Sequence, residues 1–152
     1  MNSISHTDTF RIDQSAGTLF PLFSAEGEKL WVPGWEYENV SGSDGMHEDF
    51  IFLTQSHDHA LTHADTIWLV KRYEPEIYYV QFYKVEPGQK VGVVTVRCLE
   101  VDKGITDVEV TYEYTALGES GKRFLEKFTS DHFKEFIGGW KTHLSHYFRS
   151  IQ

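Results

Sequence analysis

The feature that most constrains this sequence is a change of hydrophobic periodicity at Gly118. Before it, residues 105 to 116 alternate in character, which places successive side chains on opposite faces of a strand. The predicted inward set is Thr106, Val108, Val110, Tyr112 and Tyr114, and the predicted outward set is Asp107, Glu109, Thr111, Glu113 and Thr115. This strand therefore belongs to an antiparallel sheet that is covered on one face only.

After Gly118, large apolar residues recur at the spacing of one helix face. They are Phe133, Phe136, Ile137, Trp140, Leu144, Tyr147, Phe148 and Ile151. We predict a long C-terminal helix near residues 130–151 with a shorter helical segment before it, and this helix covers the sheet. Gly138 and Gly139 lie inside the helix, and we attribute them to close packing against the sheet, with a kink as the alternative.

The stretch between residues 35 and 116 is typical of strands separated by turns. Turn residues occur at 41–45, at Glu74-Pro75-Glu76, at Pro87-Gly88 and at Asp102-Lys103-Gly104. The segments between them, at 66–73, 77–85, 91–101 and 105–116, are rich in β-branched and aromatic residues. With a first strand over residues 4–12, we expect an α+β fold with about seven antiparallel strands.

Two short helices are predicted between the first strand and the remaining strands, near residues 15–22 and 25–31. Ser15 and Ser24 are residue types that favour helix N-caps. Pro21 breaks what would otherwise be one longer helix.

Composition excludes several classes of function. The chain has 14 Lys and Arg against 23 Asp and Glu, a net charge of −9, which disfavours binding to nucleic acid or to anionic membranes. No apolar run is long enough to span a bilayer, and the polar N-terminus has no signal-peptide core. The one cysteine, Cys98, excludes an internal disulfide. We expect one cytoplasmic domain over residues 1–152, as a monomer or homodimer, with no cofactor.

One segment, Leu19 to Trp35, contains the signature Trp-x-Pro-Gly-Trp at residues 31–35. With Trp68 to Pro75, Tyr79 to Gly88, Tyr112 to Leu117 and the helix that carries Trp140, it resembles the START-like superfamily (SRPBCC). That superfamily includes the birch-pollen allergen, lipid-transfer domains and polyketide cyclase-like proteins, and the signature is similar to a bacterial subgroup of small cyclase-like proteins. The resemblance implies a helix-grip fold, in which a curved sheet wraps around the C-terminal helix and a hydrophobic ligand lies between them. The superfamily shares no catalytic motif, so no catalytic residue is carried over.

We therefore expect the protein to bind a small hydrophobic or aromatic ligand, lipid- or polyketide-like, in a cavity between sheet and helix. The alternatives are a cyclase, dehydrase or hydrolase acting on such a ligand, and a protein-interaction module of the chaperone-assisting type. A binding protein is favoured over an enzyme. The predicted ligand-lining residues are Trp31, Trp35, Trp68, Tyr79, Arg97, Tyr112, Tyr114, His132, Phe136 and Trp140.

Candidates for catalysis are His132 and Tyr112. His132 precedes Phe136 by one helical turn, so we expect it to face the sheet, as a general base or as a half-buried histidine bonded to a neighbour. Tyr112 offers an apolar body with a polar tip, which suits either a ligand site or ordinary core. Arg97 would pair with an anionic head group, but its strand has valines on both faces and its direction is not predicted.

The histidines His57, His59 and His63 are the weak candidates for a metal site. In a strand, His57 and His59 would face the same way, as a two-histidine site requires. No third ligand at fixed geometry is evident, so we expect a solvated hairpin and no metal.

Overall fold

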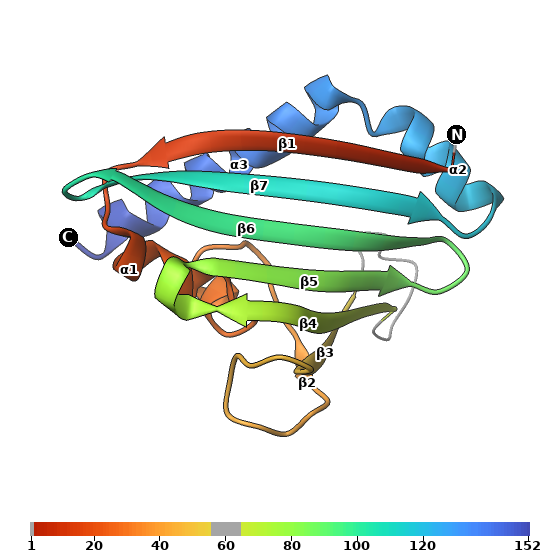
Figure 1. Ribbon diagram of the computed structural model, residues 1–152, viewed down its shortest axis with the longest axis horizontal. Coiled ribbons are helices and arrows are strands. Elements are labelled where there is room, and N and C mark those ends of the chain that lie inside the picture. Colours follow the sequence, from red (N-terminus) through yellow and green to blue (C-terminus); the bar gives the residue numbers. More distant parts are fainter. Residues whose placement is uncertain (1, 56–64) are drawn as a thin grey trace.

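The computed structural model describes residues 2–55 and 65–152. Its centre is a seven-stranded antiparallel sheet with the strand order β1-β7-β6-β5-β4-β3-β2 (Figure 1). The strands are β1 (Ser3–Ile12), β2 (Glu38–Asn39), β3 (Ile51–Thr54), β4 (Thr66–Glu74), β5 (Tyr79–Glu86), β6 (Lys90–Asp102) and β7 (Ile105–Ala116). The first strand therefore lies beside the last, and the strands between follow one another as a meander.

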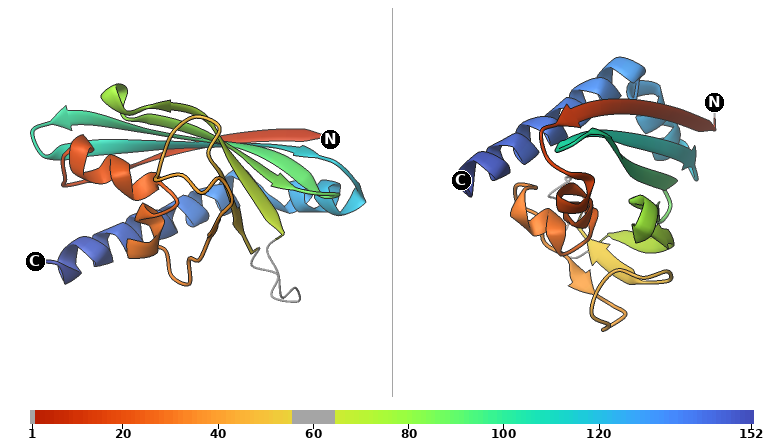
Figure 2. Two further views of the ribbon diagram at one scale, coloured as in Figure 1. Left: turned by 90° about the horizontal axis from the view of Figure 1, so that it is seen from below. Right: turned by 60° about the vertical axis from the view of Figure 1, so that its left-hand side comes forward.

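The helical segments are α1 (Ala16–Leu19), the 3-10 turns η1 (Phe20–Phe23), η2 (Gly27–Leu30) and η3 (Pro75–Ile77), and the helices α2 (Glu119–Lys127) and α3 (Ser130–Ser150). Figure 2 shows α3 and the short segments after β1 on the same side of the sheet. As predicted, Ser15 caps α1 by accepting a hydrogen bond from the Thr18 amide at 3.2 Å. Pro21 lies in η1, where the regular helix gives way to a 3-10 turn. These elements confirm the predicted curved sheet, two short helical segments and long final helix.

The predicted one-sided character of β7 is confirmed. Its inward residues Thr106, Val108 and Val110 are fully buried, and Tyr112 and Tyr114 are buried with them. Glu113 and Thr115, on the other face, are exposed. The core consequently lies between this face and α3, whose buried residues are Phe133, Ile137, Leu144 and Phe148.

Two local predictions differ from the structure. The strand expected from residue 77 begins instead at Tyr79, because Pro75–Ile77 forms a 3-10 turn and Tyr78 adopts a left-handed conformation at φ 56°. Gly138 and Gly139 do not pack closely against the sheet, because a Cβ at either position would meet nothing within 4 Å. No helix in residues 2–55 and 65–152 is long and apolar enough to cross a bilayer.

Candidate functional site

One row of cross-strand neighbours brings polar groups together on the inner face of the sheet. Trp68 of β4 is the partner of Lys84 of β5. Lys84 lies opposite Gly92 of β6, which in turn lies opposite Tyr114 of β7. The Lys84 Nζ donates a hydrogen bond to Tyr114 Oη at 3.1 Å, above the glycine. A Cβ at position 92 would lie 2.7 Å from Tyr114 Cε1, so the side chain of Tyr114 occupies the space that glycine leaves.

Three aromatic rings lie around the ammonium of Lys84, which is a half-buried residue. Its Nζ lies 5.4 Å from the ring centroid of Trp68, 5.9 Å from that of Tyr112 and 5.7 Å from that of Tyr114. A cation within about 6 Å of a ring centroid is attracted by the face of the ring. The rings thus hold the charge partly desolvated, on the side of the sheet that faces α3.

The Lys84 ammonium has no ion-pair partner in residues 2–55 and 65–152, since no carboxylate oxygen there lies within 4.0 Å of Nζ. The next inward carboxylate, Glu86, pairs with Lys90 at 2.8 Å, and both of those side chains are largely buried. Burial lowers the pKa of Lys84, but Tyr114, Glu86 and Glu28 together raise it by more, so the group stays protonated. At a pH below the pKa of Glu28, which is about 8, this part of the interior therefore carries a net positive charge.

Tyr112 adds a second hydroxyl on the inner face of the sheet. The residue is 5% exposed, and within the described ranges its Oη makes no hydrogen bond. Burial raises its pKa well above the ordinary value, with smaller contributions from Tyr114, Glu28 and Glu86, so the phenol is neutral. A hydroxyl without a protein partner on an otherwise buried side chain can bond to a ligand or to water.

Glu28 reaches the same region from η2. Burial raises the pKa of its carboxyl to about 8, while the nearby Lys84 ammonium acts in the opposite direction. In the part of the chain that the structure describes, the carboxyl forms neither a hydrogen bond nor an ion pair. We refer to Lys84, Tyr112, Tyr114 and Glu28 as the Lys84 cluster.

Aromatic side chains form the wall opposite the sheet. Trp31 and Trp140 of α3 have ring centroids 5.6 Å apart, and Phe23 stacks on Trp140 at 6.0 Å. The indole N–H of Trp31 donates to the Leu22 carbonyl at 2.7 Å. Since this donor already has a partner, the tryptophan supplies an apolar surface and not a polar contact.

Phe136 is the exposed part of this wall. Its side chain is 39% exposed, and its ring centroid lies 5.6 Å from that of Tyr112. Phe136 therefore joins the aromatic wall to the surface of the molecule on the α3 side.

The structure brings together six of the predicted ligand-lining residues in or against the core: Trp31, Trp35, Trp68, Tyr112, Tyr114 and Trp140. Three others lie elsewhere. Tyr79 and Arg97 are on the outer face, where Tyr79 stacks under Arg72 at 4.9 Å and Arg97 pairs with Glu109 at 3.3 Å. His132 is exposed, so its expected orientation toward the sheet is wrong.

His57, His59 and His63 lie outside the described residues. Among residues 2–55 and 65–152, no group of three or more His, Cys, Asp or Glu side chains is placed to hold a metal ion.

Lys84 and Glu28 were missed in the sequence. Val80, Phe82 and Lys84 are alternate residues of β5, so their side chains lie on the same face of the strand. This alternation was the signal in the sequence that could have indicated an inward lysine. No comparable signal marks Glu28, whose neighbours Glu26 and Lys29 are exposed.

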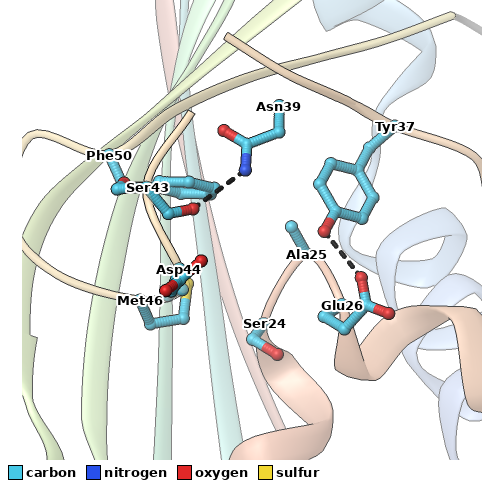
Figure 3. A pocket seen from close by; sticks show the side chains of 10 residues that line it. Ser24, Ala25, Glu26, Tyr37, Asn39, Ser43, Asp44, Met46 and Phe50 are labelled. Carbon is cyan, nitrogen blue, oxygen red and sulfur yellow. Dashed lines mark hydrogen bonds between the residues drawn. The ribbon is translucent and has the colours of Figure 1, made fainter. Parts of the chain in front are cut away.

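Two hollows at the surface lie apart from the Lys84 cluster. The first, of about 330 Å³, lies between the start of η2 and the segment between β2 and β3 (Figure 3). Tyr37 Oη donates to Glu26 Oε2 across it at 2.6 Å, which lowers the pKa of Glu26 and raises that of Tyr37 to about 12. The second, of about 280 Å³, lies between β1 and the start of α3 and contains His6, Asp8 and Lys134. Neither hollow contains a residue of the Lys84 cluster.

No protein-family model matches the sequence, and no curated protein matches it. Solved structures do match. Ara h 8.0201 superimposes with a TM-score of 0.70 at 11% identity, over 97% of this chain and 99% of that one. Norcoclaurine synthase from Thalictrum flavum, in complex with dopamine and hydroxybenzaldehyde, superimposes with a TM-score of 0.67 at 15% identity. The match covers 95% of this chain and 88% of that one.

The di-domain ARO/CYC protein BexL, from the BE-7585A biosynthetic pathway, gives a TM-score of 0.68 at 12% identity, over 95% of this chain and 47% of that one. Similarity at these identities concerns the fold. The chain has the helix-grip fold, a curved antiparallel sheet with a long C-terminal helix, that it shares with Ara h 8.0201.

Proposed function

We propose that this protein binds a small hydrophobic or aromatic ligand between the inner face of the sheet and α3, at the Lys84 cluster. The observation that carries the proposal is a pair of incompletely bonded polar groups among aromatic rings: within residues 2–55 and 65–152, the Lys84 ammonium has one hydrogen-bond acceptor and the Tyr112 hydroxyl has no partner. Binding sites for small molecules are mostly apolar with a few convergent polar groups, and perturbed titration marks such sites.

The structural neighbours agree with this proposal. One of them was solved with dopamine and hydroxybenzaldehyde, both small aromatic compounds, and another is an ARO/CYC protein of a biosynthetic pathway. These neighbours favour an aromatic, polyketide-like ligand for this protein, and a lipid-like ligand is the other class that we expect.

Native mass spectrometry of the freshly purified protein tests the proposal, with the denatured mass as reference. A small molecule that is released on denaturation would support binding. If no small molecule is released, titration with N-phenylnaphthylamine, a neutral aromatic fluorophore, distinguishes a protein whose binding site is unoccupied from a protein that has no binding site. We expect saturable binding that Tyr112→Phe weakens, and Tyr147→Phe, at a half-buried position of α3 outside the Lys84 cluster, serves as the control. Absence of both a released mass and saturable binding would overturn the proposal.

Glu28 favours a second candidate, an acid–base enzyme of the cyclase or dehydrase type. A carboxyl with a pKa of about 8 can take up and release a proton near neutral pH. Lys84 and Tyr114 would polarise a carbonyl while Glu28 moves the proton from the adjacent carbon. We expect the protein to accelerate deuterium exchange next to the carbonyl of phenylacetone, and Glu28→Gln to abolish the acceleration. Exchange at the rate of buffer alone would reject an enzyme of this kind for that probe class.

A further inference from the structure

We infer that the ligand of the Lys84 cluster is an aromatic compound with one ionised acidic group, a carboxylate, phenolate or enolate, which pairs with the Lys84 ammonium. This inference rests on the proposed function and specifies the class of ligand. It follows from the hydrogen-bonding capacity of the cluster, from its charge and from the rings around it.

The first step concerns donors. An ammonium has three N–H donors, and the structure gives one of them an acceptor, Tyr114 Oη at 3.1 Å. The other two have no acceptor in residues 2–55 and 65–152. The Tyr112 hydroxyl, in a residue 5% exposed, is likewise unpaired within those ranges. A compact set of donors without acceptors, held among aromatic rings, is complementary to an oxyanion.

The second step concerns charge. Lys90 and Glu86 form a pair at 2.8 Å and neutralise each other. The Lys84 charge remains uncompensated by any carboxylate within 4.0 Å among the described residues. An isolated charge in an enclosed site is costly unless a counter-ion joins it. A ligand with one negative charge supplies that counter-ion, whereas a neutral ligand leaves the cost in place.

The third step concerns the body of the ligand. The Trp68 ring lies 5.4 Å from Nζ on one side, and Trp140 closes the opposite wall, where its centroid is 6.3 Å from that of Tyr112. Flat aromatic surfaces next to a cation suit a ring that carries its acidic group at the edge. Gly92 lets the Tyr114 ring lie close to the sheet, where its hydroxyl reaches Lys84.

The net charge of the chain makes this inference selective. At −9, the protein as a whole attracts cations and repels anions. Non-specific electrostatics therefore predicts that a cationic aromatic compound binds better than its anionic analogue. The Lys84 cluster predicts the opposite order.

The experiment compares three naphthalene compounds of matched size: naphthoate, naphthalenemethanol and naphthylmethylamine. Each is used to displace N-phenylnaphthylamine from the wild-type protein at neutral pH. We expect affinity to fall in the order anion, neutral compound, cation, by about ten-fold or more across the series. The reverse order, or equal affinities, would overturn the inference while leaving the proposed function intact. Absence of any fluorophore binding would count against the proposed function itself.

Two variants test whether the preference for the anionic compound depends on Lys84. Lys84→Met should remove the preference for the anion by about ten-fold, because it removes the ammonium and keeps the length of the side chain. Lys71→Met, at an exposed position on β4, is the matched control and should leave the preference unchanged. Circular dichroism shows whether Lys84→Met folds. If it does not, the order of affinities in the wild-type protein still decides the question.

Discussion

At the scale of single residues, the site depends on side chains whose direction is set by strand register. Lys84 faces inward because β5 places it in phase with Val80 and Phe82. The sequence of β5 has mixed character on both faces, so its inward set could not be assigned without the neighbouring strands. Tyr79 on β5 and Arg97 on β6 were predicted to line the ligand site, but both lie on the outer face. Their strands also have apolar residues on both faces, so the sequence did not indicate which way these side chains point.

Glu28 makes the stability of the protein depend on pH. Its pKa is raised from 4.5 to about 8 in the folded state, so the folded chain holds more protons than the unfolded chain between these values. The free energy of unfolding therefore falls as pH rises through this window, with a slope of at most about 1.4 kcal/mol per pH unit. We expect Glu28→Gln to remove this contribution and to be more stable than wild type at alkaline pH.

Urea unfolding at several pH values measures this effect, with Glu113→Gln at an exposed position of β7 as the control. Parallel pH profiles for the wild type and Glu28→Gln would show that Glu28 titrates normally.

Gly92 is a position where only the smallest residue fits. Alanine there would place Cβ 2.7 Å from Tyr114 Cε1 and force the ring away from Lys84. Overpacking of this kind costs about 1–3 kcal/mol, so Gly92→Ala should unfold at lower urea concentration. Val93→Ala, the neighbouring residue on the opposite face, removes side-chain volume without this clash. Unchanged stability of Gly92→Ala would mean that Tyr114 can move freely, contrary to the role given to it here.

At the scale of elements, the parts with one wholly polar face were predictable. The predicted strand over residues 105–116 matches β7 (Ile105–Ala116), because its alternation is regular. The final helix was predicted in the right place, but its buried stripe consists of Phe133, Ile137, Leu144 and Phe148. His132 lies one residue away from this stripe, which is why its predicted orientation is wrong.

The glycine pair in α3 gives a prediction at this scale. Gly138 and Gly139 lie in a continuous helix with open space where a Cβ would be, so neither is needed for packing. Replacing glycine by alanine in a helix interior gains about 1 kcal/mol. We expect Gly138→Ala and Gly139→Ala each to raise the midpoint of thermal unfolding. A lowered midpoint would show that the helix must bend at this point.

At the scale of the whole molecule, the order of elements was sufficient to predict the helix-grip fold, since a one-sided sheet followed by an amphipathic helix has few other solutions. The site was not predictable to the same degree. The approach of Lys84 to Tyr114 joins residues 30 positions apart across an intervening strand, and only the register supplies it.

Net charge gives a further prediction for the whole molecule. Protonation of all eight histidines changes the formal charge from −9 to −1. Charge near zero promotes association, so solubility should be lowest near the sequence pI of about 5.3. Light scattering as a function of pH measures this association. We expect the scattering to be strongest near pH 5.3, and a scattering maximum at neutral pH would contradict the prediction.

The central claim is that the Lys84 cluster holds a ligand, and a crystal structure of the protein with naphthoate tests it most directly. We predict the naphthalene ring between Trp68 and Trp140, with a carboxylate oxygen about 3 Å from Lys84 Nζ. Naphthoate bound elsewhere, such as the groove beside Glu26 and Tyr37, with the rings around Lys84 unmoved, would contradict the claim.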